Sequence, residues 1–152
     1  MNERAPVLVL AVGNPSRGDD AIGPALAARL EAVALPGVEV ITEFQLQVEN
    51  ALDLVGRDRV IFVDAGTNTP APFELRRVDA APEFLHTSHA LSPEAVLATY
   101  LRVTGTAPPE SWVLCVCGES FELGEPLSAD AAVNVEAAWR ELRRRVGAES
   151  TL

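Results

Sequence analysis

One stretch decides the fold of this chain: Val7-Leu8-Val9-Leu10-Ala11-Val12-Gly13-Asn14-Pro15-Ser16-Arg17-Gly18-Asp19-Asp20-Ala21-Ile22-Gly23-Pro24. Its first half, residues 7–12, is an unbroken apolar run, which is typical of a strand buried on both faces of a parallel sheet. A glycine-rich turn between a strand and a helix often cradles a phosphate, but this turn holds Asp19 and Asp20. Because carboxylates attract cations, the turn indicates a positively charged ligand.

The pattern outside this stretch continues as strands that alternate with helices. We expect helices over residues 20–33, 48–55 and 128–146, with another that begins at Ser92-Pro93-Glu94, where serine is the N-cap and proline follows at N1. We expect strands at 38–42, 59–64 and 111–116, and an edge strand at 73–78. The alternation predicts an α/β fold, a three-layer α/β/α sandwich around a mostly parallel sheet of about five strands. The length of 152 residues fits a single domain over residues 1–152.

Composition excludes several classes of partner. The formal net charge of −10 disfavours nucleic acid, and the run Arg143-Arg144-Arg145 is interpreted as a solvated helix end. No apolar run approaches the roughly 20 residues of a membrane span, so we expect no membrane insertion. Cys115 and Cys117 are too close together for a disulfide framework, which predicts a reducing, cytoplasmic compartment. We also expect a monomer.

Candidate site residues follow the predicted strands, because open parallel sheets bind ligands beyond the carboxyl ends of their strands. Asp20 follows the first strand, Glu43 the second and Asp64 the third, and the histidines His86 and His89 precede a predicted helix. Together Asp20, Asp64 and His89 would offer two oxygens and one nitrogen to a divalent ion such as nickel, zinc or manganese. Structural alternatives stay open: acids cap helices or end strands, and loop histidines often face solvent.

Other kinds of chemistry have weaker support in the sequence. Cys115 and Cys117 share one face of a strand and could bind a metal, but free cysteines within an apolar run favour the core. We find no G-x-G-x-x-G fingerprint, no G-x-S-x-G elbow and no Ser-His-Asp set. A nucleotide-binding domain is therefore disfavoured, since acids at the turn would repel a pyrophosphate.

These motifs, in this order, resemble a known family. The segment from Val7 to Asn14, with Asp19-Asp20 and Gly23-Pro24 after it, is similar to the N-terminal signature of the [NiFe]-hydrogenase maturation endopeptidases. Residues 60–65 resemble the second acidic strand end of that family, and Ser88-His89-Ala90-Leu91 resembles its histidine segment. The Gly118-Glu119-Ser120 turn, residues 123–127 and the closing helix are also similar, so the resemblance spans nearly the whole chain.

The resemblance implies a protease that removes a C-terminal extension from the precursor of a hydrogenase large subunit after nickel has been loaded. It implies that Asp20, Asp64 and His89 are both the catalytic and the nickel-contacting residues. The position of Asp19 at the start of the predicted helix favours a capping role for it. Nickel would arrive with the precursor, although another divalent metal could occupy the isolated protein. The peptidase would be of the aspartic or the metal-dependent type.

Two departures and two alternatives accompany the resemblance. Ala21 stands where many relatives have glycine, and residues 43–47 replace a glycine-rich stretch, so the surface that meets the partner subunit should differ there. In one mechanism, the metal activates a water molecule or the scissile carbonyl. In the other, which we favour, the metal serves only as a tag by which the enzyme recognises the precursor. The alternative function is a metal-dependent binding module or chaperone that holds the large subunit without cutting it.

Overall fold

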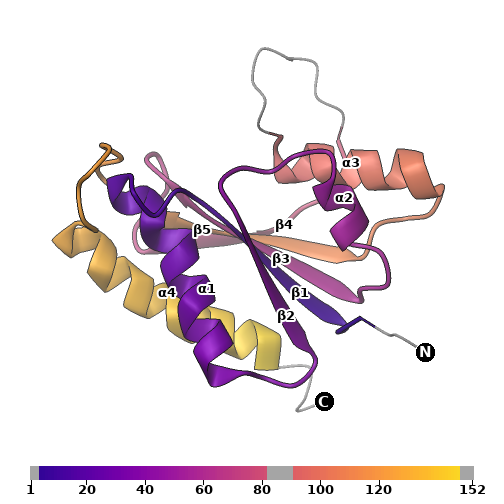
Figure 1. The fold of residues 1–152 in the computed structure, drawn as a ribbon, viewed down its shortest axis with the longest axis horizontal. Coiled ribbons are helices and arrows are strands. Elements are labelled where there is room, and N and C mark those ends of the chain that lie inside the picture. Colours follow the sequence, from indigo (N-terminus) through magenta and orange to yellow (C-terminus); the bar gives the residue numbers. More distant parts are fainter. Residues whose placement is uncertain (1–3, 82–90, 148–152) are drawn as a thin grey trace.

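The computed structural model describes residues 4–81 and 91–147, and within these ranges five strands form one sheet with helices on both faces (Figure 1). In chain order the elements are β1 (Val7–Val12), the 3₁₀ turn η1 (Gly18–Ala21), α1 (Ile22–Val33), β2 (Val38–Glu43), α2 (Asn50–Asp53), β3 (Arg59–Gly66), β4 (Phe73–Arg77), α3 (Pro93–Thr104), β5 (Glu110–Cys117) and α4 (Ala129–Gly147). This arrangement confirms the predicted α/β sandwich. None of the helices in the described ranges has the length and apolar content that a bilayer span requires.

The sheet is parallel except at one edge. Its strand order is β2-β1-β3-β5-β4, and β4 is the antiparallel edge strand that the sequence predicted. The other neighbouring pairs run parallel, so the carboxyl ends of β1, β2, β3 and β5 lie at the same edge. Val12 is level with Glu43 in this register, and Asp64 is level with Cys115. The segments that contain the candidate acids therefore lie together at one edge of the sheet.

Two hydrophobic cores lie on either side of the sheet, because alternate residues of each buried strand face opposite ways. Val9 of β1 packs with Leu26 of α1 and with residues of α4 in one core. Leu10 and Phe62 pack with residues of α2 and α3 in the other. Figure 1 shows the two helix pairs on opposite faces of the sheet. Burying side chains of this size stabilises the fold by about 1.5–3 kcal/mol each.

Several element boundaries differ from the predicted ones. β3 continues past Asp64 to Gly66, because β5 extends to Cys117 and supplies it with a pairing partner. The first helix begins with a 3₁₀ turn and becomes α-helical only at Ile22, and α2 is shorter than predicted, covering only Asn50–Asp53. The predicted cap of α3 is confirmed, since the Ala95 N–H donates to Ser92 Oγ at 3.1 Å.

Candidate functional site

The turn after β1 is built on two glycines that allow close backbone approach. Gly13 has φ of +151°, and a Cβ there would lie 2.1 Å from the carbonyl oxygen of Asp20. A Cβ on Gly23 would lie 2.4 Å from the carbonyl oxygen of Val12, so α1 rests directly on the end of β1. These glycines allow the turn to pack closely against β1 and α1. The glycine-rich pattern is therefore explained by packing and does not require a bound phosphate.

Asp20 lies at the mouth of this turn with part of its carboxylate exposed. Its Oδ2 accepts a hydrogen bond of 2.7 Å from the Asn14 N–H, whereas its Oδ1 has no partner among the described residues. The side chain lines a hollow of about 540 Å³ together with Asn14, Arg17, Glu43, Phe44, Gln45 and Gln47. Within the described residues, one carboxylate oxygen is therefore held in place and the other is left for a ligand.

Asp64 projects from β3 on the same face as Phe62, which is the face covered by α2 and α3. Its Oδ1 accepts a hydrogen bond of 2.7 Å from the Ala65 N–H, and its Oδ2 has no partner in the described part of the chain. Burial raises the pKa of Asp64 to about 6, with the Ala65 hydrogen bond opposing this rise and the negative charge of Asp20 adding to it. Because the charge of Asp20 acts on Asp64, the fold brings the two predicted acids close enough to interact electrostatically.

Asp19 has a different role from the one predicted. The expectation that it caps the first helix is wrong, because neither η1 nor α1 has a side-chain cap. Its carboxylate is fully buried, at 0% exposure, and reaches the loop before α4. Oδ2 accepts bonds from the Glu119 and Ser120 N–H groups at 2.7 and 3.2 Å and from Ser128 Oγ at 2.8 Å, and Oδ1 accepts the Ser128 N–H at 2.7 Å.

These four bonds keep Asp19 ionised. Burial alone would raise the pKa of Asp19, but the hydrogen bonds from Ser128, Glu119 and Ser120 outweigh it and leave the pKa below its usual value. The loop lies beyond the end of β5, so its N–H groups find this carboxylate in place of a strand partner. Asp19 thus joins the turn after β1 to the N-terminus of α4, where Ser128 Oγ in turn accepts the Ala131 N–H at 3.1 Å.

The histidine of the predicted site cannot be placed. His86 and His89 both lie outside the described residues, and within the described ranges no group of three His, Cys, Asp or Glu side chains could hold a metal ion. Leu91, which is described, donates its N–H to the Leu46 carbonyl at 3.0 Å. That bond joins the chain just after the histidine segment to the loop between β2 and α2, which also lines the hollow at Asp20.

Glu43 is held at the same hollow by a residue that the sequence did not single out. The buried amide of Asn50 donates to Glu43 Oε2 at 3.2 Å and to Asp53 Oδ2 at 3.0 Å, and its Oδ1 accepts the Gln47 N–H at 2.8 Å. A lone asparagine in a predicted helix gives no warning of this role, since the role depends on how the loop folds back. Asn50 therefore fixes the segment from Glu43 to Asp53 as one unit.

Cys115 lies beside Asp64 on the neighbouring strand. Its Sγ is 3.0 Å from Thr69 Oγ1, and burial raises the pKa of its thiol above the ordinary value. Cys115 packs at the margin of the core under α2 and α3, although both it and Cys117 are only half-buried. The prediction that the cysteines belong to the core is thus confirmed in part for Cys115. The pairing of β3 with β5 places Cys115 next to Asp64.

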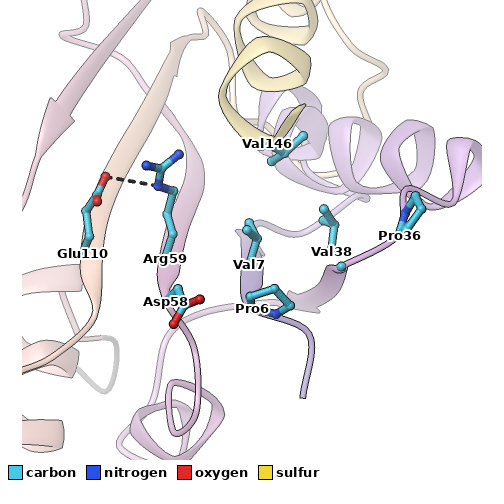
Figure 2. A pocket seen from close by; sticks show the side chains of 9 residues that line it. Pro6, Val7, Pro36, Val38, Asp58, Arg59, Glu110 and Val146 are labelled. Carbon is cyan, nitrogen blue, oxygen red and sulfur yellow. Dashed lines mark ion pairs between the residues drawn. The ribbon is translucent and has the colours of Figure 1, made fainter. Parts of the chain in front are cut away.

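A second hollow lies at the opposite edge of the sheet, at the amino ends of the strands (Figure 2). It measures about 370 Å³, and Figure 2 shows Arg59 and Glu110 paired across one side of it, with 3.1 Å between Nε and Oε2. The Trp112 indole N–H, helped by Arg59, holds the pKa of Glu110 below its usual value. These charges are already engaged with each other and with Trp112, and Asp20 and Asp64 are at the other edge, so the candidate site is the hollow at Asp20.

Comparisons with known proteins support the fold. No protein-family model matches the chain, and no curated protein matches it. Among solved structures it is similar to the hydrogenase maturating endopeptidase HybD from E. coli, at 26% identity and a TM-score of 0.71, over 95% of this chain and 93% of that one. An endopeptidase from Escherichia coli, solved in solution, gives 26% identity and a TM-score of 0.71 over 93% of each chain. The [NiFe] hydrogenase maturation protease HycI from Thermococcus kodakarensis shares the fold, at 22% identity and a TM-score of 0.69, over 91% of this chain and 90% of that one.

Proposed function

We infer that this chain is a hydrogenase maturation endopeptidase, which removes the C-terminal extension from the nickel-loaded precursor of a [NiFe]-hydrogenase large subunit. The observation that carries this proposal is the nearly full-length likeness to an endopeptidase of that class, joined to the pair Asp20 and Asp64 at the ligand-binding edge of the sheet. A shared fold alone would not name an activity. Here the two acids of the resembling motifs also lie at the same edge of the sheet, and the charge of Asp20 acts on Asp64.

The free oxygens of the two acids support nickel as the feature that the site reads. In the described structure Asp20 and Asp64 each keep one carboxylate oxygen without a partner, and each has the other oxygen fixed by a backbone N–H. A divalent cation between them would relieve the repulsion that contributes to the raised pKa of Asp64. We propose that this cation is the nickel held by the precursor, and that His89 supplies the third contact.

The histidine assignment has support from the described chain. Leu91 is bonded to Leu46, at the loop that lines the hollow, and only one residue separates Leu91 from His89 in the sequence. Two residues of chain span at most about 7 Å. We propose that the His89 side chain adds a nitrogen ligand to the two carboxylate oxygens around the cation, a combination that suits nickel as well as zinc or manganese.

Peptide hydrolysis needs a group that takes a proton from water and returns one to the leaving amine. We assign this role to Asp64, because one of its carboxylate oxygens is held by the Ala65 N–H and the other has no partner among the described residues. The water oxygen would bond to the scissile carbonyl carbon, the carbon–nitrogen bond would break, and the amine would leave with the proton. The peptidase would then be of the aspartic type, with the substrate's nickel as a recognition tag.

Compartment and assembly state belong to the same proposal. The cysteines Cys115 and Cys117 are both free, which fits the reducing cytoplasm in which we place the protein. We propose that it acts as a monomer on its large-subunit partner.

The test is a processing assay with purified full-length chain and a nickel-loaded large-subunit precursor, followed by mass spectrometry of the precursor. We expect the wild-type chain to release one C-terminal peptide, and Asp20→Ala, Asp64→Ala and His89→Ala each to slow release by about 100-fold or more. Glu31→Ala, which changes an exposed acid on α1, should process normally. Circular dichroism would confirm that each variant is folded.

Three outcomes of this assay would contradict the proposal at different levels. Binding of the precursor without cleavage by the wild-type chain would favour the chaperone alternative. Neither binding nor cleavage, with an active control protease, would overturn the hydrogenase assignment. Full activity in all three site variants would leave the family in place and refute the site.

A further inference from the structure

The segment from Phe44 to Val55, which follows β2 and includes α2, carries exposed apolar side chains. Phe44 is 68% exposed, Val48 55%, Leu52 56% and Val55 42%. An isolated exposed apolar residue is ordinary, but four within twelve positions of one segment are a feature that needs a partner. We refer to these four residues as the apolar strip.

The backbone of this segment explains why the strip faces outward. Successive turns, each closed by a hydrogen bond between residues three apart, run from Gln47 to Arg57. In such a coil the inward positions Ala51 and Leu54 are buried in the core beneath α2, at 2% and 0% exposure. Val48, Leu52 and Val55 of the same segment are exposed, so the segment carries apolar side chains both inside and outside. A surface element of one domain has no need of that second apolar side.

The strip is continuous with the candidate site. Phe44 lines the hollow at Asp20, and so does Gln47, the residue that begins the series of turns. From the hollow the strip leads outward along α2, on the α2 and α3 side of the sheet (Figure 1). A chain that reached the acids from this side would pass over the apolar strip.

The strip is also held rigidly. Leu46 is buried between Phe44 and Val48, and its carbonyl accepts the Leu91 N–H. The three hydrogen bonds of Asn50 hold the segment from Glu43 to Asp53 from inside. An exposed aromatic residue on a preorganised loop loses little entropy on binding, which is the character of an interface anchor.

We propose that the apolar strip is the docking surface for an apolar segment of the large-subunit precursor, and that it holds the precursor while the scissile bond lies at Asp20 and Asp64. This inference rests on the proposed function and adds to it the place where the partner binds. Charge argues against a second copy of this chain as the occupant. In a two-fold dimer through this strip, Glu43, Glu49 and Asp53 would come close to the same acids of the second copy, and Glu49 is exposed to that repulsion.

The small area of the strip argues for a large partner that also covers the candidate site. A stable complex buries about 800 Å² on each partner, which is more than four side chains provide. The contact must therefore extend from the strip into the neighbouring hollow. The acids that border the strip further favour a partner segment whose apolar residues are flanked by basic ones.

The test compares processing kinetics of two matched variants of the full-length chain with the nickel-loaded precursor. The variant Leu52→Ser/Val55→Ser removes two side chains of the strip that do not line the hollow at Asp20. The control Val133→Ser changes a side chain that is 69% exposed on α4, on the other side of the sheet (Figure 1). We expect the strip variant to raise KM about ten-fold or more with kcat within about two-fold, and the control to match the wild-type chain.

The results separate this inference from the proposed function. If the wild-type chain cleaves and the strip variant, shown to be folded by its thermal melting curve, keeps its KM, the docking surface is refuted and the peptidase stands. An equal rise in KM for Val133→Ser would also refute it, because the effect would not be specific to the strip. If the wild-type chain does not cleave, the precursor's Kd for the same variants still decides the docking surface. Sedimentation of a wild-type dimer that the strip variant dissociates would assign the strip to a second copy.

Discussion

Asp19 and Asp20 are adjacent in the chain, but the fold uses them in opposite ways. Asp19 is fully buried and accepts four hydrogen bonds from the loop before α4. Asp20 is partly exposed, accepts one hydrogen bond from Asn14 and shares its electrostatic environment with Asp64. Both are carboxylates in one turn, so the difference comes from what the rest of the chain places around each of them.

The contrast shows how hydrogen bonding separates a structural acid from a reactive one. Enough N–H and O–H donors surround Asp19 to outweigh the cost of its burial, and its pKa falls. Asp64 has one N–H donor for its carboxylate, and burial together with the charge of Asp20 raises its pKa to about 6. The first arrangement stabilises the fold, whereas the second leaves an unfavourable charge for a ligand or a proton to neutralise.

Replacing Asp19 should have the largest effect on stability. Asp19→Ala leaves the buried donors of Glu119, Ser120 and Ser128 without their acceptor, so we expect the free energy of unfolding to fall by about 3 kcal/mol or more. Asp20→Ala loses only the bond from Asn14 and should cost about 1 kcal/mol while it abolishes processing. Urea unfolding of both variants measures the difference, and equal losses would erase the distinction between the two acids.

The pH dependence of the free energy of unfolding gives a second way to distinguish the structural acid Asp19 from the candidate site acid Asp64. The native pKa of about 6 lies above the ordinary 3.8, so between these values the native state binds more protons than the unfolded state. The contribution of Asp64 to stability therefore falls as pH rises from about 4 to about 6. Asp19, whose pKa is lowered, acts with the opposite sign: its contribution is present above its ordinary pKa and is lost as pH falls through the native value.

Asp64→Asn isolates the first of these effects, because asparagine does not titrate. We expect the variant to gain about 2 kcal/mol relative to the wild-type chain between pH 4 and pH 7, since partial exposure of the carboxyl reduces the full linkage value. Urea midpoints at several pH values measure this gain. A difference between the two chains that stays constant with pH would mean that Asp64 has an ordinary pKa.

The smallest effect concerns the partner of Asp19 at the start of α4. Ser128 Oγ donates to Asp19 Oδ2 and accepts the Ala131 N–H, so Ser128→Ala removes a helix cap and one of the four bonds. We expect a loss of about 1–2 kcal/mol in the free energy of unfolding, with the Ser128 N–H bond to Asp19 kept. Ser92→Ala, at the cap of α3, is the matched control, since it loses a cap but no contact with Asp19. Equal losses in the two variants would show that the bond to Asp19 adds nothing.

Local pattern was sufficient to predict most of the fold. The apolar run of β1, the Ser92-Pro93 cap and the apolar positions of α1 each report on a single element, and each was confirmed. The rule that parallel sheets bind ligands at the carboxyl ends of their strands also predicted that Asp20 and Asp64 would lie at the same edge of the sheet, while their roles there stay predictions. These predictions succeed because backbone geometry and burial act over a few neighbouring residues.

Non-local contacts account for what the sequence did not reveal. Asp19 was misassigned as a cap because its partners at Glu119, Ser120 and Ser128 lie about a hundred positions away. The amide of Asn50 and the thiol of Cys115 acquire their places at the site from a folded loop and from strand register. The order of residues by itself determined the elements, their layers and the edge that carries the acids. Only the tertiary structure decided which aspartate is satisfied and which is left reactive, because that depends on the donors that distant segments bring to each carboxylate.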